Sequence, residues 1–276
     1  VLMLLRIIKK TPNISFIEYR KFFYLLSILF ALIALISVWM RGLNFGIDFR
    51  GGLLVEVKFN NNVEVDEIRQ EIANINIGDF SLQGLDSSKD NYLLKMELDS
   101  KSQNNQEELI NKVKKKLADK FGSEIDYRRV EYVGPTVSKE LVYAGIIAII
   151  VAIVSMLIYI WFRFELPFAI GAVIALVHDT ILTVGMFSIT ALEFNLSTVA
   201  AILLIIGYSM NDTVVVYDRI RENLKKFKKI EIVKLLNKSI NETLSRTINT
   251  TATTILALLA LYIFGGNIIK DFSLAM

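Results

Sequence analysis

Five long apolar runs limit the fold of this 276-residue sequence more than any other feature. A helix needs about 20 predominantly apolar residues to cross a bilayer. The runs are Phe22–Met40, Leu141–Phe162, Leu166–Ile189, Leu196–Tyr217 and Thr247–Phe264. We therefore predict an α-helical membrane protein with five transmembrane helices, of which the second and third form a tight hairpin.

The first run is expected to remain as an anchor. The apolar core of a signal peptide has about 7–15 residues and is followed by a small-residue cleavage site, and neither property fits Phe22–Met40. At the other end of the chain, Phe272–Met276 resembles the first turn of another apolar helix. We expect a sixth span to begin there and to be truncated in this sequence.

Charged residues make up 21% of the chain and gather in residues 41–140 and 218–246. Lysine and arginine in short loops mark the cytoplasmic side of a membrane protein. Lys9, Lys10, Arg20 and Lys21 precede the first span, so residues 1–21 are predicted to be cytoplasmic. Counting spans then places 41–140 in the periplasm and the basic segment 218–246 in a cytoplasmic loop. Its basic residues are expected to mark topology and contact anionic lipid, with a specific protein contact as the alternative. Residues 141–276 hold the second to fifth spans.

The periplasmic segment has the pattern of a small α+β domain. Residues that alternate between apolar and polar predict strands, and apolar residues at helical spacing predict helices. The predicted order is strand Leu53–Phe59, helix Val63–Ile75, strand Phe80–Leu85, turn Asp86–Asp90, strand Tyr92–Leu98, helix Asn104–Phe121 and strand Ile125–Val133. This β-α-β-β-α-β order is that of the ferredoxin-like fold.

Several function classes are excluded by composition. The chain has no cysteine, which excludes disulfides, thiolate metal sites and a cysteine nucleophile. Its one histidine, His178, cannot form a histidine-rich metal centre. There is no P-loop motif for nucleotide hydrolysis, and a net charge of +3 is too small to indicate nucleic acid as a partner. We therefore expect no cofactor, no enzymatic activity, and a partner or the membrane as the energy source.

Four segments carry a resemblance to a known family. They are Asn44–Gly52 (NFGIDFRGG), Val133–Ser138 (VGPTVS), Gly207–Asn223 (GYSMNDTVVVYDRIREN) and Ser245–Thr251 (SRTINTT). The first is similar to a segment shared by SecD and SecF proteins, and the others resemble the SecF branch of this SecD/SecF family, part of the wider resistance-nodulation-division superfamily. The resemblance implies a complex with SecD, association with the SecYEG channel, and use of the proton-motive force to export unfolded polypeptides across the bacterial inner membrane.

Ionisable residues within the apolar runs are the candidate functional residues, because charge is costly inside a bilayer. Asp212 lies in the fourth run beside Asn211. Desolvation favours proton uptake by such a carboxyl group, and a nearby cation favours proton release. Arg246, at the start of the fifth run, is the natural partner. The resemblance assigns both charged residues to proton transport, whereas helix packing for Asp212 and lipid anchoring for Arg246 remain alternatives.

The other candidates are weaker. Asp179 follows His178, but adjacent helix positions point about 100° apart, which argues against a dyad. We expect a polar contact from Asp179 to the fourth or fifth span, with a supporting role in proton transfer. Asp218 and Arg219 are expected to form interfacial ion pairs. A polar stripe either hydrates a pathway or joins helices, and the pattern leaves both possibilities open; it consists of Thr247, Thr250, Thr251 and Thr254.

Two glycine-containing pairs are candidate hinges. Gly51–Gly52 predicts a tight turn, and Gly134–Pro135 predicts a break before the second span. Structural punctuation is the simpler interpretation of both pairs.

Three rival functions fit parts of this pattern. An efflux transporter of the same superfamily usually has two large outside domains and about twelve spans, about twice what this sequence offers. An intramembrane aspartyl protease would use Tyr217–Asp218, but the second aspartate motif that it requires is absent. A structural scaffold would use its intramembrane charges for packing alone.

Overall fold

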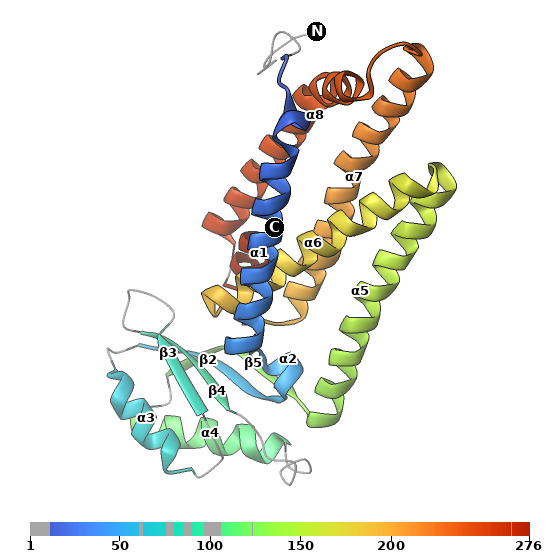
Figure 1. Ribbon diagram of the computed structural model, residues 1–276. Coiled ribbons are helices and arrows are strands. Elements are labelled where there is room, and N and C mark those ends of the chain that lie inside the picture. Colours follow the sequence, from blue (N-terminus) through green and yellow to red (C-terminus); the bar gives the residue numbers. More distant parts are fainter. Residues whose placement is uncertain are drawn as a thin grey trace. The chain divides into compact units, whose positions relative to one another are not determined.

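The computed structural model describes residues 12–60, 63–75, 80–84, 90–96, 106–122, 124–265 and 267–276 (Figure 1). The chain divides into two compact units, one formed by Val1–Asn44 with Ile146–Met276 and the other by Phe45–Gly145. We call the first the membrane unit and the second the sheet unit. Lys9, Lys10 and residues 86–89 of the expected turn lie outside the described residues.

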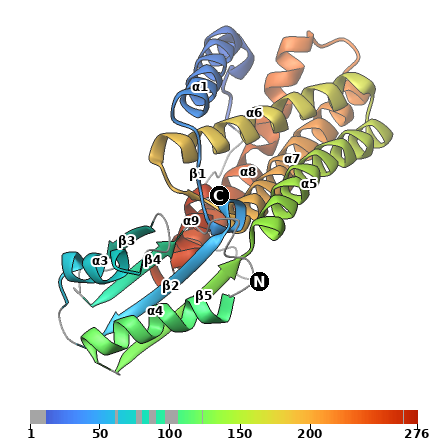
Figure 2. The same ribbon diagram turned by 90° about the horizontal axis from the view of Figure 1, so that it is seen from below.

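The sheet unit has the predicted order of elements. After a short helix α2 (Ile47–Arg50), the elements are β2 (Gly52–Phe59), α3 (Val65–Ala73), β3 (Phe80–Gly84), β4 (Asn91–Met96), α4 (Gln106–Phe121) and β5 (Ile125–Val133). The strands form one antiparallel sheet in the order β3-β4-β2-β5. This confirms the predicted ferredoxin-like arrangement. Figure 2 shows the sheet with its two longer helices.

Alternate side chains of β2 form the centre of this unit's core. Leu53, Val55, Val57 and Phe59 are buried and pack with residues of α3 and α4, so both helices cover the same face of the sheet. On β4, the Tyr92 hydroxyl donates a hydrogen bond to the Val63 carbonyl. Burial, and secondarily the charge of Asp90, raises the pKa of Tyr92.

The turn predicted at Gly51 is confirmed. Gly51 has φ +78°, which L side chains rarely adopt, and an added Cβ would lie 3.3 Å from both Ser138 Oγ and the Val133 carbonyl oxygen. Gly134 immediately precedes helix α5 (Pro135–Arg163), whose first residue is a proline. Proline has no backbone N–H, and the first residue of a helix has no intrahelical partner for one. Both pairs therefore lie where one helix or strand ends and the next begins, and their action as hinges stays a prediction.

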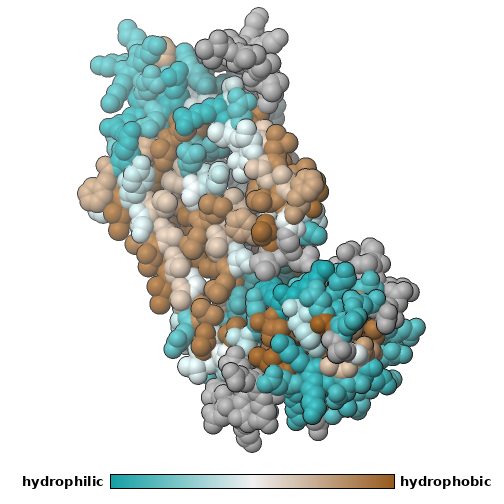
Figure 3. Space-filling model, turned by 180° about the vertical axis from the view of Figure 1, so that it is seen from behind, coloured by the Kyte–Doolittle hydropathy of each residue, from teal (hydrophilic) through white to brown (hydrophobic). Residues whose placement is uncertain are grey.

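The predicted spans lie mainly in the membrane unit, and one of them begins in the sheet unit. Among the described residues, five helical segments are long and apolar enough to cross a membrane, which makes this a multi-pass membrane protein: Phe16–Arg41, Pro135–Arg163, Leu166–Thr190, Leu196–Lys226 and Ile232–Phe264. The first contains a 3-10 turn η1 (Phe16–Tyr19) and helix α1 (Arg20–Arg41), and the last three are α6, α7 and α8. A further helix α9 (Asn267–Ala275) follows, and its continuation as a sixth span stays a prediction. Apolar side chains cover much of these helices in Figure 3.

The helices are longer than the apolar runs. Helix α7 continues to Lys226 and α8 begins at Ile232, so the segment 218–246, expected to be a cytoplasmic loop, is mainly helical. Likewise, α5 begins at Pro135 rather than Leu141. Hydropathy marks where a helix leaves the apolar layer, whereas lysine, arginine and glutamate are themselves good helix formers.

Small residues bring α1 and α6 together. An added Cβ on Gly185 would lie 2.2 Å from the Cβ of Ala34. Ser27 pairs with His178 on one side of this contact and Ser37 with Ser188 on the other. The residue numbers of the partners rise together, so the two helices run parallel, as the predicted topology requires. Small residues permit such close approach in lipid, where no hydrophobic force drives helices together.

This contact predicts the effect of a single methyl group. Gly185→Ala should destabilise the membrane unit by about 1–3 kcal/mol, because the new Cβ overlaps Ala34. The matched control is Gly207→Ala in α7, where an added Cβ meets nothing within 4 Å. Thermal unfolding of the detergent-solubilised protein measures both. Equal melting temperatures for the two variants would contradict the close α1–α6 contact.

Candidate functional site

A chain of hydrogen-bonded side chains crosses the membrane unit. Ser209 Oγ on α7 donates to Asp179 Oδ2 on α6 at 2.6 Å. Asp179 Oδ1 lies 3.3 Å from His178 Nδ1, and His178 Nε2 lies 3.0 Å from Ser27 Oγ on α1. We call these four residues the Ser27–Ser209 chain. It links three helices through two adjacent residues of α6.

The Ser27–Ser209 chain contains the polar contact that was predicted for Asp179 and a second contact that was not predicted. The predicted polar contact from Asp179 to the fourth span is made by Ser209. The two adjacent side chains also meet, with Nδ1 and Oδ1 3.3 Å apart, which the 100° offset between neighbouring helix positions did not predict. The aspartate side chain is 36% exposed and the histidine 28%.

Asp212 lies one helical turn beyond Ser209 on α7. It is half-buried, its neighbour Asn211 is exposed, and Arg246 on α8 is exposed. Although α7 and α8 pack against each other, no ion pair within 4 Å joins Asp212 to Arg246 in the part of the chain that the structure describes. The expected partners therefore lie on neighbouring helices and form no ion pair with each other among the described residues.

The threonine stripe bonds to its own helix. Thr250 Oγ1 donates to the carbonyl oxygens of Thr247 and Arg246, and Thr254 Oγ1 donates to that of Thr250. Thr251 is exposed and Thr247 is half-buried. Since the hydroxyl protons of Thr250 and Thr254 are already used, these two residues present acceptor oxygens rather than donors to whatever lies beside α8.

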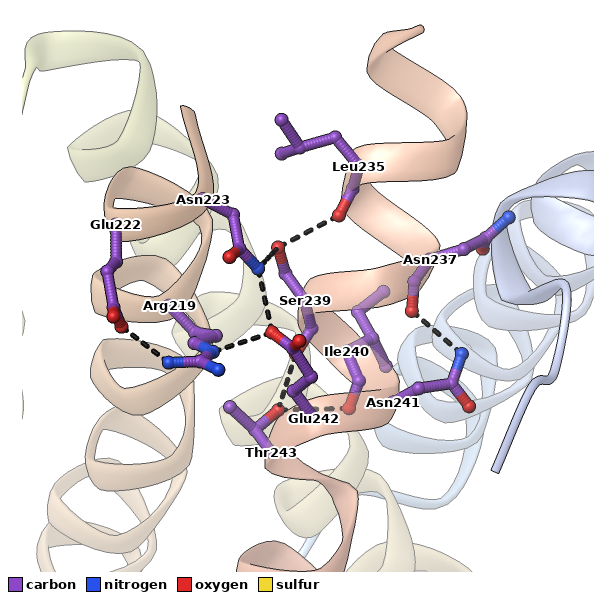
Figure 4. A network of polar contacts seen from close by, with 10 residues as sticks. All are labelled: Arg219, Glu222, Asn223, Leu235, Asn237, Ser239, Ile240, Asn241, Glu242 and Thr243. Atoms are coloured by element: carbon purple, nitrogen blue, oxygen red, sulfur yellow. Dashed lines mark hydrogen bonds and ion pairs between the residues drawn. The ribbon is translucent and has the colours of Figure 1, made fainter. Parts of the chain in front are cut away.

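A second polar network joins α7 to α8 near residues 227–231, which connect the two helices (Figure 4). Arg219 Nε donates to Glu242 Oε2 at 2.7 Å and Arg219 Nη1 to Glu222 Oε2 at 2.6 Å. Asn223 Nδ2 donates to the same Glu242 oxygen at 2.8 Å and to Ser239 Oγ at 2.9 Å. Glu242 thus accepts two hydrogen bonds from α7, one turn before Arg246 on α8.

Asp218 and Arg219 both form ion pairs, as predicted, and their position at the membrane surface stays a prediction. Arg219 pairs with Glu222 and Glu242. Arg163, at the end of α5, donates to both carboxylate oxygens of Asp218 at 2.9 and 3.2 Å. Tyr217, just before this pair, packs edge-on against Phe168.

The chain segment before α1 is attached to α8 by two asparagine side chains. Asn241 accepts from the backbone N–H of Ile14 at 3.1 Å and donates to its carbonyl oxygen at 2.8 Å. Asn237 accepts from the N–H of Ile17 at 2.9 Å. Sequence reasoning missed both asparagines, as it missed Glu242, because their partners are 19 or more residues away along the chain. In the described ranges no group of three or more His, Cys, Asp or Glu residues could hold a metal.

The two carboxylates bound to Arg219 are predicted to differ in their contribution to stability. Glu242→Gln should lower the free energy of unfolding by about 1–2 kcal/mol, because it weakens charge-assisted bonds from both Arg219 and Asn223. Glu222→Gln, whose side chain is 61% exposed, should change it by less than about 1 kcal/mol. Thermal unfolding in detergent compares them, and a larger effect of the exposed residue would contradict the network's role.

Comparisons with known proteins give a consistent family. The profile described as "Protein export membrane protein SecD/SecF, C-terminal" matches residues 112–276, and the "SecD/SecF GG Motif" matches residues 36–63. Proteins named protein translocase subunit SecF are similar to this chain over 98% of its length. The one from Rickettsia bellii (strain OSU 85-389) is 46% identical and 88% covered, and that from Rickettsia felis is 44% identical and 86% covered.

Solved structures agree with the sequence matches. The crystal structure of SecDF, a translocon-associated membrane protein from Thermus thermophilus, has a TM-score of 0.83 at 33% identity. SecDF in its super-membrane-facing form has a TM-score of 0.67 at 32% identity. Each match covers 96% of this chain, which spans 36% of the solved chain. The resemblance predicted from the motifs is thereby confirmed, and the chain belongs to the SecD/SecF family of protein export membrane proteins.

Proposed function

We propose that this chain is the SecF-type subunit of a bacterial protein translocase and acts with a SecD-type partner at the SecYEG channel. In this proposal the proton-motive force drives completion of the passage of unfolded polypeptides across the inner membrane. The N-terminus is cytoplasmic and the sheet unit is periplasmic. The names of the relatives support the translocase assignment, and the greater length of SecDF supports a partner.

One observation supports proton coupling above the others. Within helices long enough to span the membrane, polar groups remain open on α7 and α8. Asn211, Arg246 and Thr251 are exposed and Asp212 is half-buried. Each ionised group would be costly against lipid. The helices of a partner subunit can cover this polar face, and a proton path between the two subunits explains why an aspartate and an arginine occur there.

The energy available is sufficient to bias a two-state domain. One charge crossing 100 mV releases about 2.3 kcal/mol, which shifts a two-state equilibrium more than tenfold. In the proposed cycle, Asp212 takes up and releases the proton as its distance from Arg246 changes. Asp179 and Asn211 support the carboxylate, and the threonines of α8 supply acceptor oxygens along the path. The sheet unit responds by changing its position about Gly51–Gly52 and Gly134–Pro135.

The aspartate can be tested against a neighbour on the same helix. Asp212→Asn should reduce gradient-dependent export at least tenfold, because amide cannot carry the proton. Asp218→Asn is the matched control, since this residue forms an ion pair with Arg163 in which both side chains are 44% exposed. Export of a preprotein into inverted membrane vesicles, with and without a proton gradient, measures both. Wild-type gradient dependence of Asp212→Asn in an assembled complex would refute the proposal.

The proposed partner can be located by cross-linking, because the chain has no cysteine of its own. A single-cysteine variant Thr251→Cys should cross-link to the SecD-type subunit, since the exposed face of α8 near Arg246 is proposed to be covered by it. Leu32→Cys, at a position on α1 that is 50% exposed and apolar, should not cross-link to this subunit. Failure of Thr251→Cys in a complex that still contains the partner would rule out this placement.

A further inference from the structure

The Ser27–Ser209 chain carries an inference that rests on the proposed proton coupling and extends it. We propose that His178 carries a proton during the transport cycle, and that the chain relays this proton between α1 and the neighbourhood of Asp212. The residues assigned so far lie on α7 and α8, apart from Asp179. The proposal adds a titratable side chain on α6 and a hydroxyl on α1.

The position of His178 is unusual for a packing residue. It lies midway between Leu166 and Thr190, the ends of α6, and so about 18 Å from each end at the rise of a helix. A histidine at this depth is far from both membrane surfaces and cannot act as an interfacial anchor. Of the ordinary side chains, histidine is the one whose unperturbed charge change falls between pH 5 and 8.

The hydrogen-bond geometry allows the proton to move without heavy-atom rearrangement. A neutral imidazole has one donor and one acceptor nitrogen. When Nδ1–H donates to Asp179 Oδ1, Nε2 accepts from the Ser27 hydroxyl. Transfer of the Ser27 hydroxyl proton to Nε2, while the Ser27 oxygen takes up a proton from water, produces an imidazolium. The serine is again a neutral hydroxyl, whose oxygen now accepts from Nε2–H. Passage of the Nδ1 proton to Asp179 leaves a neutral imidazole protonated at Nε2 and a neutral carboxyl group.

The far end of the chain lies beside the proposed proton carrier. Asp179 Oδ2 accepts from Ser209, and Asp212 follows Ser209 by one turn on the same helix. Loss of the Asp179 charge weakens the 2.6 Å hydrogen bond from Ser209. Protonation of Asp179 on α6 therefore changes a side-chain contact of α7. The relay therefore connects proton arrival near α1 with the helix that carries Asp212.

The charged and titratable surroundings of His178 are few. Within the apolar length of α1, Tyr24 is the titratable side chain nearest to Ser27 and is 66% exposed. On α7, Tyr208 and Asp212 flank Ser209 within one turn. On α6, Asp179 is the group in direct contact.

The same helix pair offers an internal comparison. Ser37 Oγ and Ser188 Oγ lie 2.9 Å apart and also join α1 to α6, without a titratable group. A purely structural requirement for a polar contact between these helices is met by such a pair. A structural role therefore predicts similar effects of Ser27→Ala and Ser37→Ala, whereas a relay predicts that only Ser27→Ala alters proton-linked behaviour.

The test measures gradient-dependent export by the assembled translocase in proteoliposomes at a series of pH values. His178→Gln keeps a polar side chain that does not exchange protons and should flatten the pH profile, with roughly tenfold slower export at its optimum. Ser27→Ala should shift the profile in the same direction by a smaller amount. Ser37→Ala should retain the wild-type profile.

Three results would overturn the relay. They are a wild-type pH profile for His178→Gln, equal shifts for Ser27→Ala and Ser37→Ala, or an unchanged Ser27→Ala profile when His178→Gln fails to assemble. Asp212→Asn, measured in the same vesicles, separates the two proposals. If Asp212→Asn loses gradient dependence while His178→Gln keeps the wild-type profile, proton coupling stands and the relay alone is wrong. If Asp212→Asn retains gradient dependence, the proposed function itself is wrong.

Discussion

The close approach of α1 to α6 at Ala34 and Gly185 is the contact on which the polar architecture of the membrane unit depends. Lipid supplies no hydrophobic force between helices, so association relies on van der Waals packing and hydrogen bonds. With the backbones this close, Ser27 reaches His178 and Ser37 reaches Ser188. Wider separation would leave the imidazole of His178 without its partner on α1, in surroundings where an unpaired polar group is costly.

Polar groups in the membrane unit fall into two classes, and the difference between them identifies the face proposed to be functional. Asp179 and Glu242 accept hydrogen bonds from neighbouring helices, and Asp218 is paired with Arg163. Asp212 and Arg246 are not joined to each other in the described residues, and the arginine is exposed. The first class holds helices together, and one of its members, Asp179, also belongs to the proposed relay. The second class remains open, which suits groups whose interactions change during a cycle.

Sequence reasoning succeeded where a periodic pattern or an energetic rule acts locally. Apolar length identified five spans, and alternation identified the strands. The cost of intramembrane charge points to Asp212, whose role stays a prediction. It failed where the outcome depends on side-chain torsions or distant contacts. The 100° offset between adjacent helix positions did not predict the contact of His178 with Asp179, and nothing near Asn241 indicates that it binds the backbone of Ile14. The end of an apolar run was also a poor guide to the end of a helix, since α7 continues to Lys226.

Helix α8 is attached to other elements differently along its length. Before Arg246, Glu242 is bonded to α7 and Asn241 to the segment preceding α1, so this part is attached on two sides. After Arg246, the hydroxyls of Thr250 and Thr254 bond back to their own helix, an arrangement that weakens and often bends helices. Arg246 lies between these two parts. Ser239 and Thr243 also bond back to their own helix, so the two parts differ in their attachment to other elements rather than in this local pattern. Arg246 lies where that attachment ends.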